Sequence, residues 1–223
     1  MILEVINISK EYIRAKKLFS AVSHVSFSSA EGNLIGITGP SGGGKSTLFH
    51  MISGLVKPTS GHVRLFDQEI TDMSNDRLAE LRRTDIGYIL QGQNLLQNFT
   101  LMENICMPVY MGKRFDGAYQ KGLELLDIFG LKGMENEYPY SLSGGEQRRV
   151  SIIRAFIHSP KLVIADEPTS NLDIENASII MRFFKRASEQ KITILVSSHD
   201  IDLISSIATQ KYKMINGELT LWK

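Results

Sequence analysis

The sequence predicts an α/β fold with a mostly parallel sheet, an antiparallel β edge layer and an inserted α-helical subdomain. Three observations support this prediction: apolar runs of strand length alternate with helical patterns, short strand-like segments gather in the first third of the chain, and a helical pattern fills 94–140. With 223 residues and 43% hydrophobic residues, the chain is long enough for one large domain with a real core. We therefore expect a single domain over 1–223, with its core in 1–93 and 141–223 and the helical subdomain in 94–140.

The first half of the chain alternates strand-like and helical segments. The edge layer would come from the short strand-like segments 3–8, 22–27 and 61–66, the last of which follows a Pro-Thr-Ser-Gly turn. A buried strand over 33–38 and a helix over 45–52 lie between them, and a strand over 86–90 re-enters the core. In the helical subdomain, Thr100 and Glu103 have the spacing of a capping box, and 117–129 is amphipathic.

The second half of the chain returns to the α/β pattern. A helix over 144–158 leads to a buried strand over 162–165, and a helix over 176–190 leads to a strand over 192–196. The tail, 212–222, reads as a hairpin that turns at Asn216-Gly217, a dipeptide suited to tight two-residue turns.

The most specific motif upstream is a phosphate-binding loop over 39–47. Its residues fit G-x-x-x-x-G-K-[ST] and stand between the predicted strand and helix: Gly39, Pro40, Ser41, Gly42, Gly43, Gly44, Lys45, Ser46 and Thr47. Glycines let backbone N–H groups turn inward around a triphosphate, and the following helix presents its N-terminus to the anion. Lys45 would reach the β and γ phosphates and the Ser46 hydroxyl would bind Mg²⁺, so we expect a P-loop NTPase core with ATP and Mg²⁺ as its ligands.

Two carboxylates follow the buried strand over 162–165. Asp166 and Glu167 stand directly after this strand, which places them at its carboxyl end, where ligands bind in parallel α/β sheets. Asp166 would hold Mg²⁺, directly or through water. Glu167 would accept a proton from, or orient, the water that attacks the γ phosphate. The plainer alternative is that Glu167 only caps the next segment.

Between these two motifs stands the hexapeptide Leu-Ser-Gly-Gly-Glu-Gln at 142–147. The phosphate loop, this signature sequence and Leu-Val-Ile-Ala-Asp-Glu at 162–167 occur in an order and spacing that resembles the nucleotide-binding domain of ABC proteins, over nearly the whole chain. The resemblance implies that the chain is an ATPase. Ser143 and the amides of Gly144 and Gly145 would open a helix and form a second anion site.

Further positions match the family pattern one by one. Gln91, after Ile-Gly-Tyr-Ile-Leu, resembles the glutamine that senses metal and water, and His199 resembles the histidine that contacts the γ phosphate. Ser-Asn-Leu-Asp at 170–173 resembles the loop that crosses the dimer interface, with Asp173 as its acidic residue. Tyr12 resembles the aromatic residue that stacks on adenine. The resemblance makes Glu167, His199, Lys45 and Gln91 the catalytic candidates, and Ser46, Gln91 and Asp166 the Mg²⁺ ligands.

The resemblance also implies that one chain is an incomplete enzyme. In the family, the signature loop of one copy closes over ATP held by the phosphate loop of the other. We therefore expect a homodimer in the ATP-bound state, with ATP acting as a dimerising ligand as well as a substrate.

A narrower resemblance concerns the segments 81–83, 86–91, 94–96, 100–105 and 107–108. Together they are similar to the bacterial lipoprotein-releasing, macrolide-exporting and cell-division group, whose members work with membrane subunits by mechanotransmission. Ser170 stands where that group usually carries glycine, and Arg148 stands where glutamine is common. An integral membrane permease subunit would dock on the helical subdomain, and the candidate contacts are Leu95, Leu96, Phe99, Tyr110 and Met111. The alternative for these apolar residues is internal packing.

Composition limits the remaining possibilities. The 25 basic and 24 acidic residues nearly balance, so we expect no nucleic-acid partner, and the single Cys106 is expected to be a small packing residue. No run of 18 apolar residues spans a bilayer, and the first residues lack the basic start of a signal peptide. We expect a cytoplasmic protein, held at the inner face of the cell membrane by a membrane subunit.

Two functions stay open: the energy-coupling subunit of an export-type or mechanotransmission transporter, and a regulatory ABC ATPase acting on a cell-division or cell-wall partner.

Overall fold

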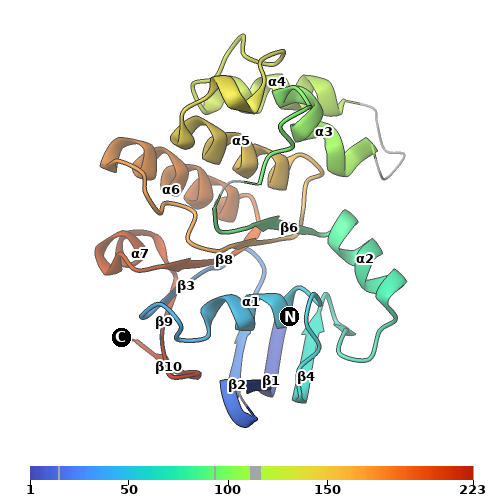
Figure 1. The fold of residues 1–223 in the computed structure, drawn as a ribbon, viewed down its shortest axis with the longest axis vertical. Helices are drawn as coiled ribbons and strands as arrows, with labels where there is room; N and C mark the ends of the chain where they lie inside the picture. The colour runs from blue at the N-terminus through green and yellow to red at the C-terminus, as the bar shows by residue number, and fades with distance from the viewer. Residues whose placement is uncertain (15, 93, 111–116, 223) are drawn as a thin grey trace.

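The computed structural model describes residues 1–14, 16–92, 94–110 and 117–222. Over these residues the strands form two sheets, and the helices gather in layers against the larger one (Figure 1). The predicted class is confirmed: a mostly parallel sheet, an antiparallel layer and a group of helices inserted between β6 and β7. Within the described ranges, no helix combines the length and apolar character needed to cross a bilayer.

The larger sheet positions the candidate site. Its strand order over the described residues is β10-β9-β3-β8-β7-β6, with β9, β3, β8, β7 and β6 mutually parallel and β10 antiparallel at the edge. The bounds are β3 (Leu34–Thr38), β6 (Ile86–Ile89), β7 (Leu162–Ala165), β8 (Thr193–Ser198), β9 (Gln210–Ile215) and β10 (Glu218–Leu221). The strands β3, β7 and β8 are buried along their whole length, as expected for a parallel sheet covered on both faces.

The smaller sheet is antiparallel and packs over one face of the larger one. Its order is β2-β1-β4-β5, with bounds β1 (Leu3–Arg14), β2 (Lys17–Ser29), β4 (Ser60–Leu65) and β5 (Gln68–Glu69). Helix α1 (Lys45–Ile52) lies between the two sheets, where Leu48 and Phe49 share one hydrophobic cluster with Ile35 and Ile37 of β3. Side chains alternate along a strand, so Leu34, the neighbour of Ile35, belongs to the cluster on the opposite face.

Most of the remaining helices cover the opposite face of the larger sheet, whereas the helix over 75–84 packs through Leu78 and Leu81 into the cluster that contains Ile35 and Ile37. The remaining helical elements are α2 (Asn75–Thr84), α3 (Leu101–Tyr110), α4 (Ala118–Ile128), the 3₁₀ turn η1 (Pro139–Ser141), α5 (Gly144–Phe156), α6 (Ile174–Glu189) and α7 (Ile201–Ile207). In Figure 1, α3, α4 and α5 gather at one end of the molecule, away from the antiparallel sheet. The predicted capping box is present at α3, where Thr100 N donates to Glu103 and Glu103 N donates to the Thr100 hydroxyl. Cys106 is fully buried in α3, which confirms its packing role.

The structure corrects several predicted element boundaries. Strands β1 and β2 extend to residues 14 and 17 and form a long hairpin, so Tyr12 lies in a strand. Two helices, α2 and α7, have no counterpart in the sequence prediction, because α2 is strongly polar and α7 is short. The division between core and helical subdomain stays a prediction, because α5 shares one hydrophobic cluster with α3 and α4.

Candidate active site

The phosphate loop connects β3 to α1, as the sequence predicts. Gly44 is the N-cap of α1 and has φ 106°, in the left-handed region that favours glycine. A Cβ at Gly44 would lie 2.3 Å from the carbonyl oxygen of Ala21, so a side chain does not fit there. At Gly42, by contrast, a Cβ would meet no atom within 4 Å. The loop therefore packs tightly against the protein on one side and leaves open space on the other, where an anion can approach the helix N-terminus.

Lys45 is buried at the centre of this loop. Its Nζ donates hydrogen bonds to the carbonyl oxygens of Gly39 (2.7 Å) and Pro40 (3.0 Å). The same Nζ lies 3.7 Å from Glu167 Oε1, and both side chains are only 6% exposed. A buried positive charge is thus fixed between the phosphate loop and the carboxylates that follow β7.

Asp166 and Glu167 are held by a serine from the neighbouring strand. The Ser197 hydroxyl on β8 donates to Asp166 Oδ1 at 2.7 Å and accepts a hydrogen bond from Glu167 N at 2.9 Å. Asp166 N also donates to the carbonyl oxygen of Ile89 at the end of β6. The carboxyl ends of three neighbouring parallel strands therefore orient the two carboxylates, as expected for this edge of the sheet. The role of Ser197 was not predicted from the sequence, although this residue stands two positions before His199.

Glu167 presents one unusual oxygen. Its Oε1 lies 3.0 Å from His199 Nε2, but this contact does not have hydrogen-bond geometry, and this buried oxygen has no hydrogen-bond partner among the described residues. Buried polar atoms are nearly always satisfied, so an unsatisfied one points to a missing water or ligand. His199 itself is about half exposed at the end of β8. The arrangement places this acceptor beside the phosphate loop, within ion-pair distance of Lys45 and His199.

One cavity unites most of the predicted residues. It has a volume of about 350 Å³, within the usual range for small-ligand sites. Its lining includes Tyr12, Ser41, Gly42, Gly43, Gly44, Lys45, Ser46, Thr47, Gln91, Asp166, Glu167 and His199. Gly39 and Pro40 do not line it but hold Lys45 in place. Phe19 and Ala21 also line the cavity and were not predicted, because the sequence did not show that β2 begins at Lys17.

The residues present fit ATP and Mg²⁺. The cavity offers the helix N-terminus and Lys45 for phosphate groups, and the Ser46 hydroxyl, Gln91 amide and Asp166 carboxylate as oxygen donors. Mg²⁺ prefers such oxygen ligands and usually binds through only one or two protein carboxylates together with phosphates and water. The unsatisfied Glu167 Oε1 supplies the matching acceptor for a bound water.

The signature sequence forms a helix N-terminus away from this cavity. Ser143 caps α5 in a full capping box: Glu146 N donates to the Ser143 hydroxyl, and Ser143 N donates to Glu146 at 2.8 Å. Hydrogen bonds from the Ser143 hydroxyl and then from its backbone lower the pKa of Glu146. Gly144 lines a separate small cavity together with Ser170, and Gly145 has Leu172 nearby. Within one chain, the signature residues therefore do not meet the phosphate loop cavity.

Asp173 also lies outside the phosphate loop cavity. It is exposed and caps α6, accepting hydrogen bonds from the backbone and side chain of Asn176 at 2.8 and 2.7 Å. These hydrogen bonds lower the pKa of the Asp173 carboxyl. The structure thus gives Asp173 a local structural role and leaves its predicted part in nucleotide binding as a prediction.

The candidate docking residues differ in how far their side chains are exposed. Leu95 is 6% exposed and belongs to the core, so the packing alternative is correct for this residue. Leu96, Phe99 and Tyr110 are each about 40% exposed, at 45%, 39% and 40%. Met111 lies outside the described residues. The exposed members stay candidates for a partner contact, whereas Leu95 does not.

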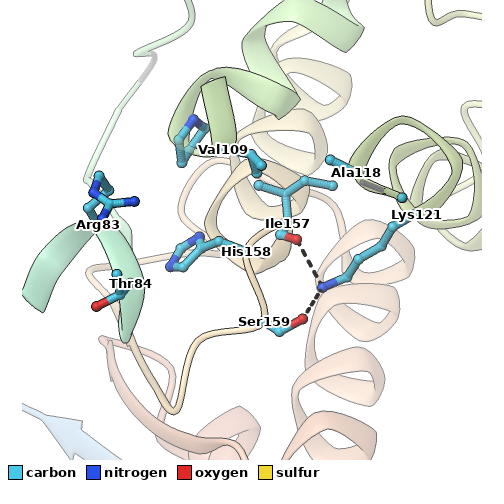
Figure 2. A pocket seen from close by; sticks show the side chains of 10 residues that line it. Arg83, Thr84, Val109, Ala118, Lys121, Ile157, His158 and Ser159 are labelled. Atoms are coloured by element: carbon cyan, nitrogen blue, oxygen red, sulfur yellow. Dashed lines mark hydrogen bonds between the residues drawn. The ribbon is translucent and has the colours of Figure 1, made fainter. Parts of the chain in front are cut away.

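A second cavity lies between α2, α3, α4 and the segment after α5 (Figure 2). Three basic side chains, Arg83, Lys121 and His158, line it. Their charges already have partners: Arg83 pairs with Glu80, and Lys121 Nζ donates to Phe156 O, Ile157 O and the Ser159 hydroxyl. Among the described residues, this cavity therefore joins the helices of the insertion to the core without offering a free cation.

The fold and the phosphate loop cavity together define a P-loop ATPase. A family model described as ABC transporter matches residues 22–170, which is more than half of the chain. The chain belongs to the ABC transporter family.

Individual relatives agree with this assignment. The chain is 40% identical over 221 residues to the lipoprotein-releasing system ATP-binding protein LolD of Buchnera aphidicola subsp. Schizaphis graminum (strain Sg), covering 98% of this chain and 96% of the relative. A dimeric structure of the ATP-binding cassette MJ0796 in a post-hydrolysis state bound to ADP and Pi matches with TM-score 0.91 and 31% identity, over 100% of this chain and 99% of that one. A nucleotide-free ATP-binding cassette matches with TM-score 0.82 and 28% identity, over 98% and 89%. The chain is accordingly the ATP-binding and ATP-hydrolysing subunit of a membrane ABC transporter.

Proposed function

We propose that the chain powers an export-type or mechanotransmission complex similar to a lipoprotein-releasing system. Support comes from the 40% identity to the lipoprotein-releasing ATP-binding protein over almost the full length of both chains. That likeness favours transport work over the regulatory alternative at a cell-division or cell-wall partner. The chain would act at the inner face of the membrane, held there by an integral membrane subunit.

The hydrolytic roles follow from the cavity. The loop amides and Lys45 would bind the phosphates, and Ser46, Gln91 and Asp166 would hold Mg²⁺, which supplies positive charge to the phosphate oxygens. Glu167 would orient the attacking water and accept its proton at Oε1. His199 Nε2 lies 3.0 Å from the same oxygen and lines the same cavity, so it would contact the γ phosphate there. The observation that carries this proposal is the buried, unsatisfied Glu167 Oε1 beside Lys45.

Glu167→Gln tests the hydrolytic role. The amide keeps the size of the side chain and removes its basicity, so hydrolysis should fall by about 10²-fold or more while ATP binding persists. The measurement is phosphate release under saturating Mg-ATP together with equilibrium binding of ATP. Glu189→Gln, at the exposed end of α6, is the matched control and should hydrolyse at the wild-type rate. A Glu167→Gln protein that hydrolyses at the wild-type rate would refute the role.

We propose further that ATP joins two copies of the chain. The signature helix N-terminus at Ser143 faces away from the phosphate loop cavity of its own chain, so a second copy is needed to bring the two sites together. Solved structures of the similar cassette MJ0796 are described as dimeric. Each ATP would then be enclosed between the phosphate loop of one copy and the signature helix of the other.

The membrane subunit would contact the exposed residues that follow Gln91. Leu96 and Phe99 lie in the segment between Gln91 and α3, and Tyr110 ends α3. A change of position at Gln91 can therefore be passed mechanically to a partner bound at these side chains.

Phe99→Asp tests this contact, because it places a charge where an apolar partner surface would bind. We expect basal ATPase activity to stay within about twofold of wild type, while co-purification of the membrane subunit from solubilised membranes is lost. Leu221→Asp is the matched control, since Leu221 is exposed on β10, in another part of the molecule. Loss of basal activity in Phe99→Asp would show that Phe99 is needed for packing, and retained co-purification would exclude it from the interface.

A further inference from the structure

Arg148 lies in the second turn of α5, and all the nitrogens of its guanidinium group donate hydrogen bonds to backbone carbonyls. Its side chain is buried, and within the described part of the chain each of its N–H groups has an acceptor. Nε donates to Pro168 O (2.9 Å), Nη2 donates to Asp166 O (3.0 Å) and Glu167 O (2.9 Å), and Nη1 donates to Leu90 O and Gly92 O (3.2 Å). Burial lowers the pKa of Arg148 to about 10, so the group stays charged at neutral pH.

These carbonyls belong to two segments that carry the proposed chemistry. Leu90 and Gly92 flank Gln91, so Nη1 holds the carbonyl that precedes Gln91 and the carbonyl of the residue that follows it. The other three carbonyls follow β7 and include those of Asp166 and Glu167. One side chain of the signature helix thus joins the metal-binding and water-activating segments, which lie 58 and about 20 residues away in sequence.

The backbone of Glu167 needs such support. Its φ is 49°, in the left-handed region that residues other than glycine rarely adopt. Ser197 fixes the N–H of this residue, and Arg148 fixes its carbonyl together with Ser170. The orientation of these two peptide groups decides where Oε1 points, so a loss of the guanidinium would let the carboxylate turn away from the phosphate loop.

We propose that Arg148 is a positioning residue for ATP hydrolysis, which fixes Glu167 and Gln91 through their backbones and links both to the signature helix. The inference rests on the proposed roles of Glu167 and Gln91. Arg148 does not line the phosphate loop cavity, so it acts on these residues and does not contact the nucleotide held by its own chain. Removing it should therefore slow the chemical step and leave nucleotide affinity nearly unchanged.

Arg154 provides the matched control on the same helix. Its guanidinium is also largely buried, and burial also lowers its pKa. Within the described part of the chain, its guanidinium donates to the backbone and side-chain oxygens of Asn94, and no hydrogen bond reaches the carbonyls of Asp166 or Glu167. Arg154→Met therefore removes a largely buried guanidinium and its contact from α5 to Asn94, which lies between β6 and α3 as Gln91 does. The carbonyls of Asp166 and Glu167 keep their hydrogen bonds from Arg148.

The experiment compares full-length Arg148→Met, Arg148→Lys and Arg154→Met with wild type. For each protein, kcat and KM for ATP, the equilibrium Kd for ATP and the midpoint of thermal unfolding are measured. Small displacements of a reacting group can cost about 10²-fold, so we expect kcat of Arg148→Met to fall by about 10- to 100-fold. Its Kd for ATP should stay within about threefold of wild type. Its unfolding midpoint should fall further than that of Arg154→Met, because five carbonyls lose their donor, but should stay above the temperature of the assay. Arg148→Lys keeps the charge but can donate fewer hydrogen bonds, so its kcat should lie between those of wild type and Arg148→Met.

A second comparison repeats Arg148→Met in the Glu167→Gln background. If Arg148 acts through Glu167, the second change should lower the residual rate by a much smaller factor than it does in wild type. An equal factor in both backgrounds would overturn the proposal, as would a kcat of Arg148→Met equal to that of Arg154→Met. Wild-type activity of Glu167→Gln itself would instead reject the proposed role of Glu167, so the two failures are distinguishable.

Discussion

Tyr12 and Phe19 illustrate how single side chains complete the nucleotide cavity. The two residues are paired directly across the β1–β2 hairpin, and both line the cavity that contains the phosphate loop. Both are partly exposed, at 41% and 51%. Aromatic side chains beside a phosphate site are suited to stack on a purine base, and Lys10 Nζ lies 5.3 Å from the centre of the Tyr12 ring.

The residue-scale prediction concerns these two aromatic side chains. Tyr12→Ala should raise the Kd for ATP by about 5- to 150-fold, since a base stack contributes about 1–3 kcal/mol. Phe19→Ala should raise it as well, and kcat at saturating ATP should stay near wild type in both. Leu18→Ala is the control, because Leu18 is exposed on the same hairpin and does not line the cavity. Unchanged ATP affinity in Tyr12→Ala would remove Tyr12 from the base site.

At this scale, the sequence predicted residues whose role is set by a motif and missed those whose role is set by distant contacts. The cavity gathers the phosphate loop residues, Gln91, Asp166, Glu167 and His199, as the motifs imply. Ser197 and Arg148 were not predicted, because their partners lie 30 and up to 58 residues away and no spacing rule connects them.

Elements with strong patterns were predicted most closely. The bounds of α1 and β7 agree with the prediction, and the tail hairpin turns at Asn216-Gly217, where both residues have positive φ. The hairpin of β1 and β2 was predicted too short, because its outer half is exposed and shows no alternation of buried and exposed residues. The polar helix α2 has no clear hydrophobic periodicity from which it could be predicted. It is stabilised by its Ser74 cap and by the burial of Leu78 and Leu81.

The connection between α5 and β7 contains a partly buried histidine. His158 lies close to the end of α2, as Figure 2 shows, and its Nε2 is 3.2 Å from Ile86 O. Burial, more than the nearby charges, lowers the pKa of His158. Ile86 O raises this pKa, Lys121 and Arg83 lower it, and Asp85 raises it. The folded state therefore favours the neutral imidazole.

This burial predicts a pH dependence at the scale of the element. The unfolded chain binds a proton at His158 more readily than the folded chain, so stability should fall as pH drops below about 6.5, by at most about 1.4 kcal/mol per pH unit. His158→Asn should lose less stability than wild type between pH 7.5 and pH 5.5, as measured by urea unfolding. His24→Asn, at an exposed position in β2, should behave as wild type. An identical pH dependence in His158→Asn and wild type would contradict this account.

At the scale of the whole molecule, the phosphate loop cavity and the signature helix N-terminus are the two halves of one expected site. They lie on different parts of the same chain, with Arg148 connecting the signature helix to the carboxylates. The sequence motifs predicted both halves, while the connection between them became visible only in the folded structure.

The central claim is that ATP brings two copies of this chain together and is hydrolysed between them. The most direct measurement is the sedimentation mass of the Glu167→Gln protein with Mg-ATP, compared with Mg-ADP and with a Ser143→Arg second change that blocks the signature helix. We predict twice the mass of the chain with Mg-ATP, and the mass of one chain in the other two conditions, with ATP binding retained in the double variant. A protein saturated with Mg-ATP that still sediments as a single chain would contradict the account.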